Sequence, residues 1–80
     1  MDQSAILARI TDVVRDELDD DALALTPATR ASDVAGWDSL AHVRIVVGVE
    51  QAFKVRFATS DIARLKTVGD LVGLVQRGLA

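Results

Sequence analysis

The chain has 80 residues, 50% of them apolar and 26% charged, which is enough for one modest hydrophobic core but leaves little room for an enclosed catalytic pocket. It has no cysteine and one histidine, which excludes a disulfide framework and argues against a metal site, and no apolar run approaches the ~20 residues that span a bilayer. Residues 1–38 contain nine acidic residues and three arginines (net charge −6), and residues 39–80 contain three acidic and six basic residues (net charge +3). Because no aromatic residues interleave those basic residues, we expect no nucleic-acid binding, but a cytoplasmic domain over residues 1–80 without membrane contact.

The first predicted element is an amphipathic helix over residues 4–18. Its apolar residues recur at helical spacing: Ile6, Leu7, Ile10, Val13, Val14 and Leu18. Acidic residues then crowd positions 16–21, and negative charge is unfavourable at a helix C-terminus, so the helix is predicted to end near Leu18. The acidic run lacks the ligand spacing and glycine of a calcium loop, so we interpret it as a solvated helix end.

A long loop is predicted over residues 19–38, because this segment shows no sustained period and holds the only proline, Pro27. Loops of this length are uncommon in small domains and often functional. We expect Leu23, Leu25 and Val34 to attach it to the core.

A second helix is predicted over residues 39–53, with Asp38 as its N-cap. It carries two apolar stripes, one expected to face the core (Ile45, Val49 and Phe53) and one beyond what a single core contact needs (Leu40, Val43 and Val47). Gly48 in its interior costs roughly 1 kcal/mol relative to alanine, which suggests close packing or local flexibility there.

Two further helices are predicted in the rest of the chain. After an extended stretch over 54–57, Thr59 or Ser60 is predicted to cap a brief helix that runs to Arg64. Thr67 and Asp70 then form a capping-box pattern that opens a last helix, with Gly78 as its terminator. The expected core comprises Ile10, Val14, Ile45, Val49, Phe53, Leu71 and Val75.

The head of the second helix is the most informative place for function. Ser39 stands in the first turn, where unpaired backbone N–H groups and the helix dipole favour negative charge. A phosphate on that hydroxyl would be stabilised there. Asp38 is expected to belong to the same cofactor site, because it brings a carboxylate beside the hydroxyl that can contact an incoming cation or basic partner. The same two residues are also ordinary helix-start residues, so this position alone leaves both interpretations open.

Three longer strings change that balance: Gly36-Trp37-Asp38-Ser39-Leu40-Ala41-His42-Val43; then Glu50, Phe53, Val55 and Phe57; then Leu65-Lys66-Thr67-Val68-Gly69-Asp70-Leu71. Together they resemble the acyl carrier protein family over essentially the whole chain. The resemblance implies an all-α bundle of three long helices and one short helix. It also implies that Ser39 carries 4′-phosphopantetheine, transferred from coenzyme A by a magnesium-dependent phosphopantetheinyl transferase. Since the chain has no cysteine, the thiol of that arm would be its only one.

The resemblance also implies a docking surface. Leu40, Val43 and Val47 match positions that in the family contact partner enzymes or the cargo, and the expected partners are acyl-loading and acyl-processing enzymes such as a ligase, an acyltransferase or a ketosynthase. Ala41, Arg44 and Arg56 stand where fatty-acid-synthase carriers usually have acids. Arg44 is predicted to border the docking stripe and contact a partner carboxylate. These departures favour a discrete carrier of polyketide, nonribosomal-peptide or related pathways.

Three rivals remain at this point: an aminoacyl or peptidyl carrier, a helical interaction module without a prosthetic group, and a serine hydrolase built on Ser39 and His42. The hydrolase is disfavoured, because no third group orients His42 and no nucleophile elbow is apparent. We therefore expect no catalytic residues, interpret His42 as a partly buried packing residue and Trp37 as a loop anchor, and expect a monomer.

Overall fold

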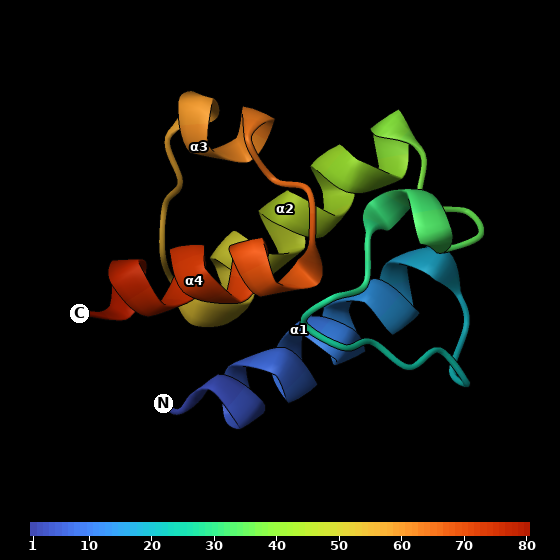
Figure 1. Ribbon diagram of the computed structural model, residues 1–80, viewed down its shortest axis with the longest axis horizontal. Helices are drawn as coiled ribbons and strands as arrows, with labels where there is room; N and C mark the ends of the chain where they lie inside the picture. The colour runs from blue at the N-terminus through green and yellow to red at the C-terminus, as the bar shows by residue number, and fades with distance from the viewer.

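A computed structural model describes all residues, 1–80. It contains α1 (Gln3–Leu18), a 3-10 turn η1 (Ala31–Asp33), α2 (Ser39–Phe53), α3 (Thr59–Ala63) and α4 (Val68–Leu79), and no strands. In Figure 1, α2 and α4 lie between α1 on one side and the short α3 on the other. The predicted all-α bundle of three long helices and one short helix is therefore confirmed. No helix is both long and apolar enough to cross a bilayer.

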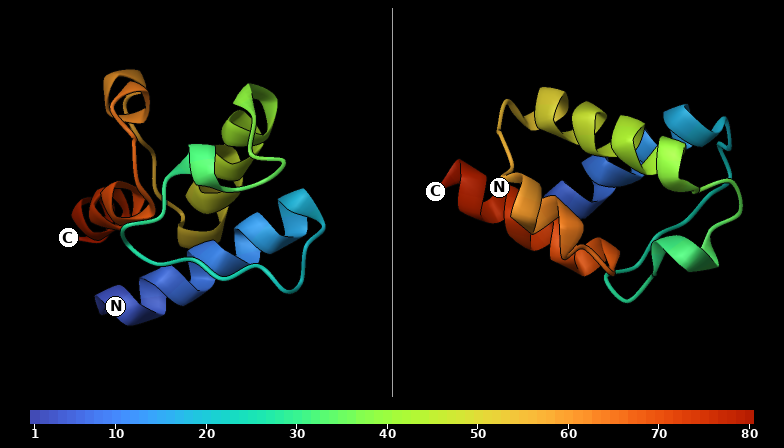
Figure 2. Two further views of the ribbon diagram at one scale, coloured as in Figure 1. Left: turned by 45° about the vertical axis from the view of Figure 1, so that its right-hand side comes forward. Right: turned by 90° about the horizontal axis from the view of Figure 1, so that it is seen from above.

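One hydrophobic cluster joins the three long helices. All seven residues expected in the core are buried, and Leu25 joins the cluster from the long loop, as expected. The cluster also takes in five residues outside the expected core: Ile6, Ala41, Val55, Val68 and Val72. Leu23 and Val34 of the long loop pack against its edge, as expected. The left view of Figure 2 shows α3 standing apart from the three long helices.

Helices α1 and α2 pack antiparallel. The Glu17 carboxylate lies 3.4 Å from the Arg44 guanidinium near one end of the pair, and the Arg9 guanidinium lies 5.7 Å from the centre of the Phe53 ring near the other. Midway, a Cβ added to Gly48 would lie 2.9 Å from a Val13 methyl carbon. The structure thus supports close packing as the role of Gly48.

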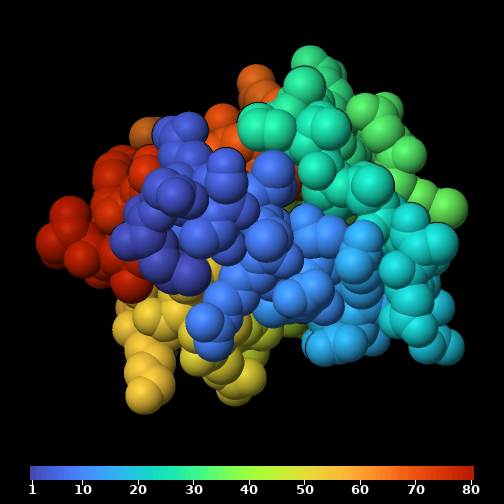
Figure 3. All heavy atoms as spheres, turned by 90° about the horizontal axis from the view of Figure 1, so that it is seen from below, coloured from blue at the N-terminus to red at the C-terminus, as the bar shows by residue number.

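The long loop is hydrogen-bonded to α1 near its start and to α4 near its middle. The Arg15 guanidinium Nε donates to the Leu23 carbonyl at 2.7 Å. Further along, the backbone N–H groups of Val68 and Gly69 donate to the Thr29 and Pro27 carbonyls at 2.8 and 2.9 Å. These bonds satisfy N–H groups that the first turn of α4 cannot satisfy itself. Figure 3 shows α1 and the chain that follows it covering much of one face of the molecule.

The predicted helix ends are partly correct. Asp38 caps α2, and Thr67 and Asp70 form the expected capping box at α4. The cap predicted for α3 is wrong, because Ala58 occupies that position without a side-chain bond and Thr59 is already helical. Gly78 does not end α4 either, since the helix runs to Leu79. A Cβ on Gly78 would lie 3.0 Å from a Val55 methyl, so its small size permits a close contact.

Candidate functional site

Ser39 is the first residue of α2 and is exposed. The Asp38 carboxylate is turned toward the helix, where its Oδ1 accepts the Ala41 backbone N–H at 2.8 Å. The N–H groups of Ser39 and Leu40 have no acceptor within the helix. The Ser39 hydroxyl therefore stands in solvent at the positive end of a helix of 15 residues, a place that favours an attached anionic group.

The segment before Ser39 is held by its tryptophan. Gly36 adopts a φ of 86°, a conformation that side-chain-bearing residues rarely take, and so turns the loop toward α2. The Trp37 backbone N–H donates to the Val34 carbonyl at 3.2 Å, while its indole Nε1–H donates to His42 Nδ1 at 3.1 Å. The structure thus supports the interpretation of Trp37 as a loop anchor and shows its partner, which the sequence analysis missed.

His42 is half-buried and its Nδ1 is engaged with Trp37. Because an indole N–H only donates, His42 Nδ1 is the acceptor in this contact. No hydrogen bond joins His42 to Ser39, and no carboxylate orients the imidazole. The packing interpretation is therefore supported, and the arrangement lacks the base that a serine nucleophile needs.

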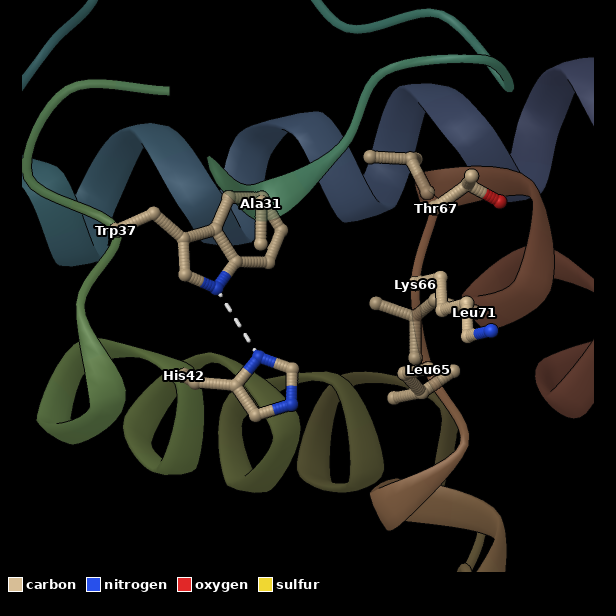
Figure 4. A pocket seen from close by; sticks show the side chains of 8 residues that line it. Ala31, Trp37, His42, Leu65, Lys66, Thr67 and Leu71 are labelled. Carbon is tan, nitrogen blue, oxygen red and sulfur yellow. Dashed lines mark hydrogen bonds between the residues drawn. The ribbon is translucent and has the colours of Figure 1, made fainter. Parts of the chain in front are cut away.

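A wide, open hollow lies next to Ser39. Four residues line both this exposed hollow and a cavity behind it: Ala31, Trp37, His42 and Leu65. The cavity holds about 20 Å³, room for a single water molecule. Figure 4 shows Trp37 and His42 on one side of the cavity and the segment 65–67 on the other. In this form the site displays Ser39 at the surface and encloses no sizeable ligand.

The residues expected to contact partners face outward from α2. Leu40 is 70% exposed, Val43 59% and Val47 43%, which is unusual for a helix whose other apolar stripe is buried. Arg44 lies beside them with its side chain 57% exposed, but it pairs with Glu17 of α1. This ion pair cannot be predicted from the sequence, because no spacing rule links two residues on different helices.

No group of three or more metal-ligating side chains gathers in the structure. The fold and the site together define a small helical bundle that displays a serine hydroxyl at the start of its second long helix.

Comparisons with known proteins identify the class more closely. Residues 8–75 match the family model described as "Phosphopantetheine attachment site". The chain is 31% identical to an acyl carrier protein of Syntrophobacter fumaroxidans over all of its own length and 99% of that protein. It is 32% identical to the meromycolate extension acyl carrier protein of Mycobacterium tuberculosis over 94% of its length and 65% of that protein. A solution structure of the holo acyl carrier protein from Geobacter metallireducens superposes with a TM-score of 0.85 at 40% identity, covering 92% of this chain and 85% of that one.

The chain therefore belongs to the phosphopantetheine-attachment family and, within it, to the acyl carrier proteins. Its cofactor is covalent phosphopantetheine, and acyl carrier proteins have no catalytic activity of their own. Members of the family work with a phosphopantetheinyl transferase and with biosynthetic enzymes.

Proposed function

We propose that Ser39 is the residue that carries the arm and that residues 1–80 act as one monomeric, cytoplasmic carrier domain. The observation that carries the proposal is the exposed Ser39 hydroxyl at the start of α2, where backbone N–H groups are free to face a phosphodiester. Asp38 supports it indirectly: its carboxylate fixes the helix start through the Ala41 N–H and leaves the hydroxyl unobstructed.

The attachment step is a transfer of a phosphoryl-linked group from coenzyme A. The Ser39 Oγ forms a new bond to phosphorus and loses its proton, while the pyrophosphate bond of coenzyme A breaks and the adenosine bisphosphate leaves. The thiol at the end of the arm would supply the thioester chemistry. Because the chain has no cysteine, acyl groups would have a single point of attachment.

The test is intact mass after incubation with coenzyme A, magnesium and a broad-specificity phosphopantetheinyl transferase. We expect the wild type to gain one arm and Ser39→Ala to gain none. Ser32→Ala is the matched control, because Ser32 lines the same hollow beside Ser39 and is also exposed. If Ser39→Ala still gains the arm, or if Ser32→Ala loses it, the assignment is wrong.

We further propose that the cargo belongs to a polyketide or related specialised pathway. Ala41 and Arg44 on α2, together with Arg56 beyond it, give this chain a different charge from fatty-acid-synthase carriers, which usually have acids there. The second candidate is an aminoacyl or peptidyl carrier, which the same residues would serve equally well. The arm-bearing carrier, with its thiol free, is incubated with candidate ligases, acyltransferases and adenylating enzymes, and its intact mass is read. This separates the acyl carrier from the aminoacyl or peptidyl carrier, because each class of enzyme adds a different cargo.

A further inference from the structure

The outer stripe of α2 is longer than the apolar residues alone suggest. Leu40, Val43, Val47 and Gln51 recur at spacings of three and four, so they fall within about 80° of one another around the helix. Lys54, the C-cap of α2, follows three residues after Gln51. All five are exposed. The stripe is therefore apolar near Ser39 and ends in a cation about 22 Å from it, since each helical residue rises 1.5 Å.

The distal end of this stripe is a basic groove. Its lining residues are Val47, Glu50, Gln51, Lys54, Val55 and Arg56. The one acid among them, Glu50, is half-buried, and its Oε2 accepts the Phe57 backbone N–H at 2.9 Å. Lys54 and Arg56 are exposed and form no ion pair or side-chain hydrogen bond.

Arg44, the cation nearer to Ser39, is already paired within the chain. Arg44 pairs with Glu17, and this is the only ion pair in the structure. Its charge is therefore already offset from within the chain, whereas the charges of Lys54 and Arg56 are available to another molecule. The one carboxylate in the groove, that of Glu50, is half-buried and accepts the Phe57 N–H through Oε2, whereas Lys54 and Arg56 are exposed, so the outward-facing charge at this end is basic.

We propose that this face of α2 docks on partner proteins whose surface is apolar opposite Leu40, Val43 and Val47 and acidic opposite Lys54 and Arg56. Charge complementarity of this kind sets the choice of partner and the association rate more than the final affinity. The acidic contacts fix the far end of α2 and so orient its near end. The prosthetic arm at the near end of α2 is part of the proposed function. The inference that the partner is acidic does not depend on that function.

Two synthetic amphipathic helices test the proposal as probes. They share a leucine face, and their polar faces carry only glutamate in one and only lysine in the other. In NMR titrations of the full chain, the glutamate helix is expected to shift the amides of residues 40–56 and to bind more tightly than the lysine helix. Its binding is expected to weaken as salt is raised, because exposed charges are screened.

Paired variants locate the effect. Lys54→Gln combined with Arg56→Gln is expected to weaken binding of the glutamate helix roughly three- to thirtyfold, as loss of two exposed ion pairs implies. The control, Arg64→Gln with Arg77→Gln, makes the same change of charge in the groove between α3 and α4, so its binding is expected to stay unchanged. Equal binding of the two helices, binding of neither, or equal losses in both double variants overturns the proposal. Attachment of the arm, read by intact mass in the same proteins, reports separately on the proposed function.

Discussion

Two glycines of α4 are predicted to respond in opposite directions to one substitution. A Cβ added to Gly73 meets no atom within 4 Å, so Gly73→Ala gains the helix propensity of alanine, up to about 1 kcal/mol. A Cβ added to Gly69 lies 2.8 Å from the Pro27 carbonyl oxygen, which also accepts the Gly69 N–H. Gly69→Ala forces the loop away from α4 and is expected to cost about 1–3 kcal/mol.

The assay is thermal and denaturant unfolding followed by circular dichroism. For a domain of this size 1 kcal/mol corresponds to roughly 4–8 °C in Tm, so Gly73→Ala is expected to melt several degrees above the wild type and Gly69→Ala well below it. A stabilising effect of both substitutions would show that the loop does not lie against the start of α4. A destabilising effect of Gly73→Ala would show that its surroundings are not open.

Three further predictions follow from the same structure. In denaturant melts, Phe53→Ala is expected to lower the free energy of unfolding by about 3–5 kcal/mol and Val47→Ala by no more than about 0.5 kcal/mol, because Phe53 is buried and Val47 faces outward. Equal losses would mean that α2 is rotated about its axis relative to the core. His42→Ala leaves the Trp37 indole N–H without its acceptor, so the emission of this single tryptophan is expected to shift to longer wavelength, and an unchanged spectrum would contradict the hydrogen bond. The backbone N–H groups of Lys66 and Thr67 hold the pKa of Asp70 below its ordinary 3.8, so the stability that it adds is present above that pH and is lost as pH falls through the lowered pKa. Asp70→Asn is therefore expected to lose less stability on acidification than the wild type, and identical acid titrations of unfolding would refute this.

Local rules were enough to predict most of the fold. Helical spacing of apolar residues located α1, α2 and α4, and the capping preferences of Asp38 and Thr67 fixed two of the helix starts. The predictions failed where a residue's role depends on a segment far away in the chain. Gly78 resembles a helix terminator locally, but it lies within α4, and the absence of a side chain there leaves room for Val55, which is distant in the sequence. Thr59 is a favourable cap by type, yet the chain enters α3 one residue earlier.

The site shows the same division. The place of Ser39 at a helix start follows from the capping preference of Asp38, and the presence of a second apolar stripe with Leu40, Val43 and Val47 follows from the sequence period. The contact of Trp37 with His42 and that of Arg44 with Glu17 do not, because the first depends on how the loop folds back and the second on how two helices pack. Both contacts affect the site. The first engages His42 Nδ1, and the second offsets the charge of Arg44, the cation nearest to Ser39 on α2.

The central claim is that acyl groups are held as a thioester on an arm at Ser39, and acyl loading tests it most directly. The protein is incubated with an acyl-coenzyme A, magnesium and a broad-specificity phosphopantetheinyl transferase, and its intact mass is read before and after treatment with hydroxylamine, which cleaves thioesters. We expect one acylated arm, loss of the acyl group alone after treatment, and no addition to Ser39→Ala. Because the chain has no cysteine, no other thioester can form. An acyl group that resists hydroxylamine, or an arm that persists in Ser39→Ala, would contradict the claim.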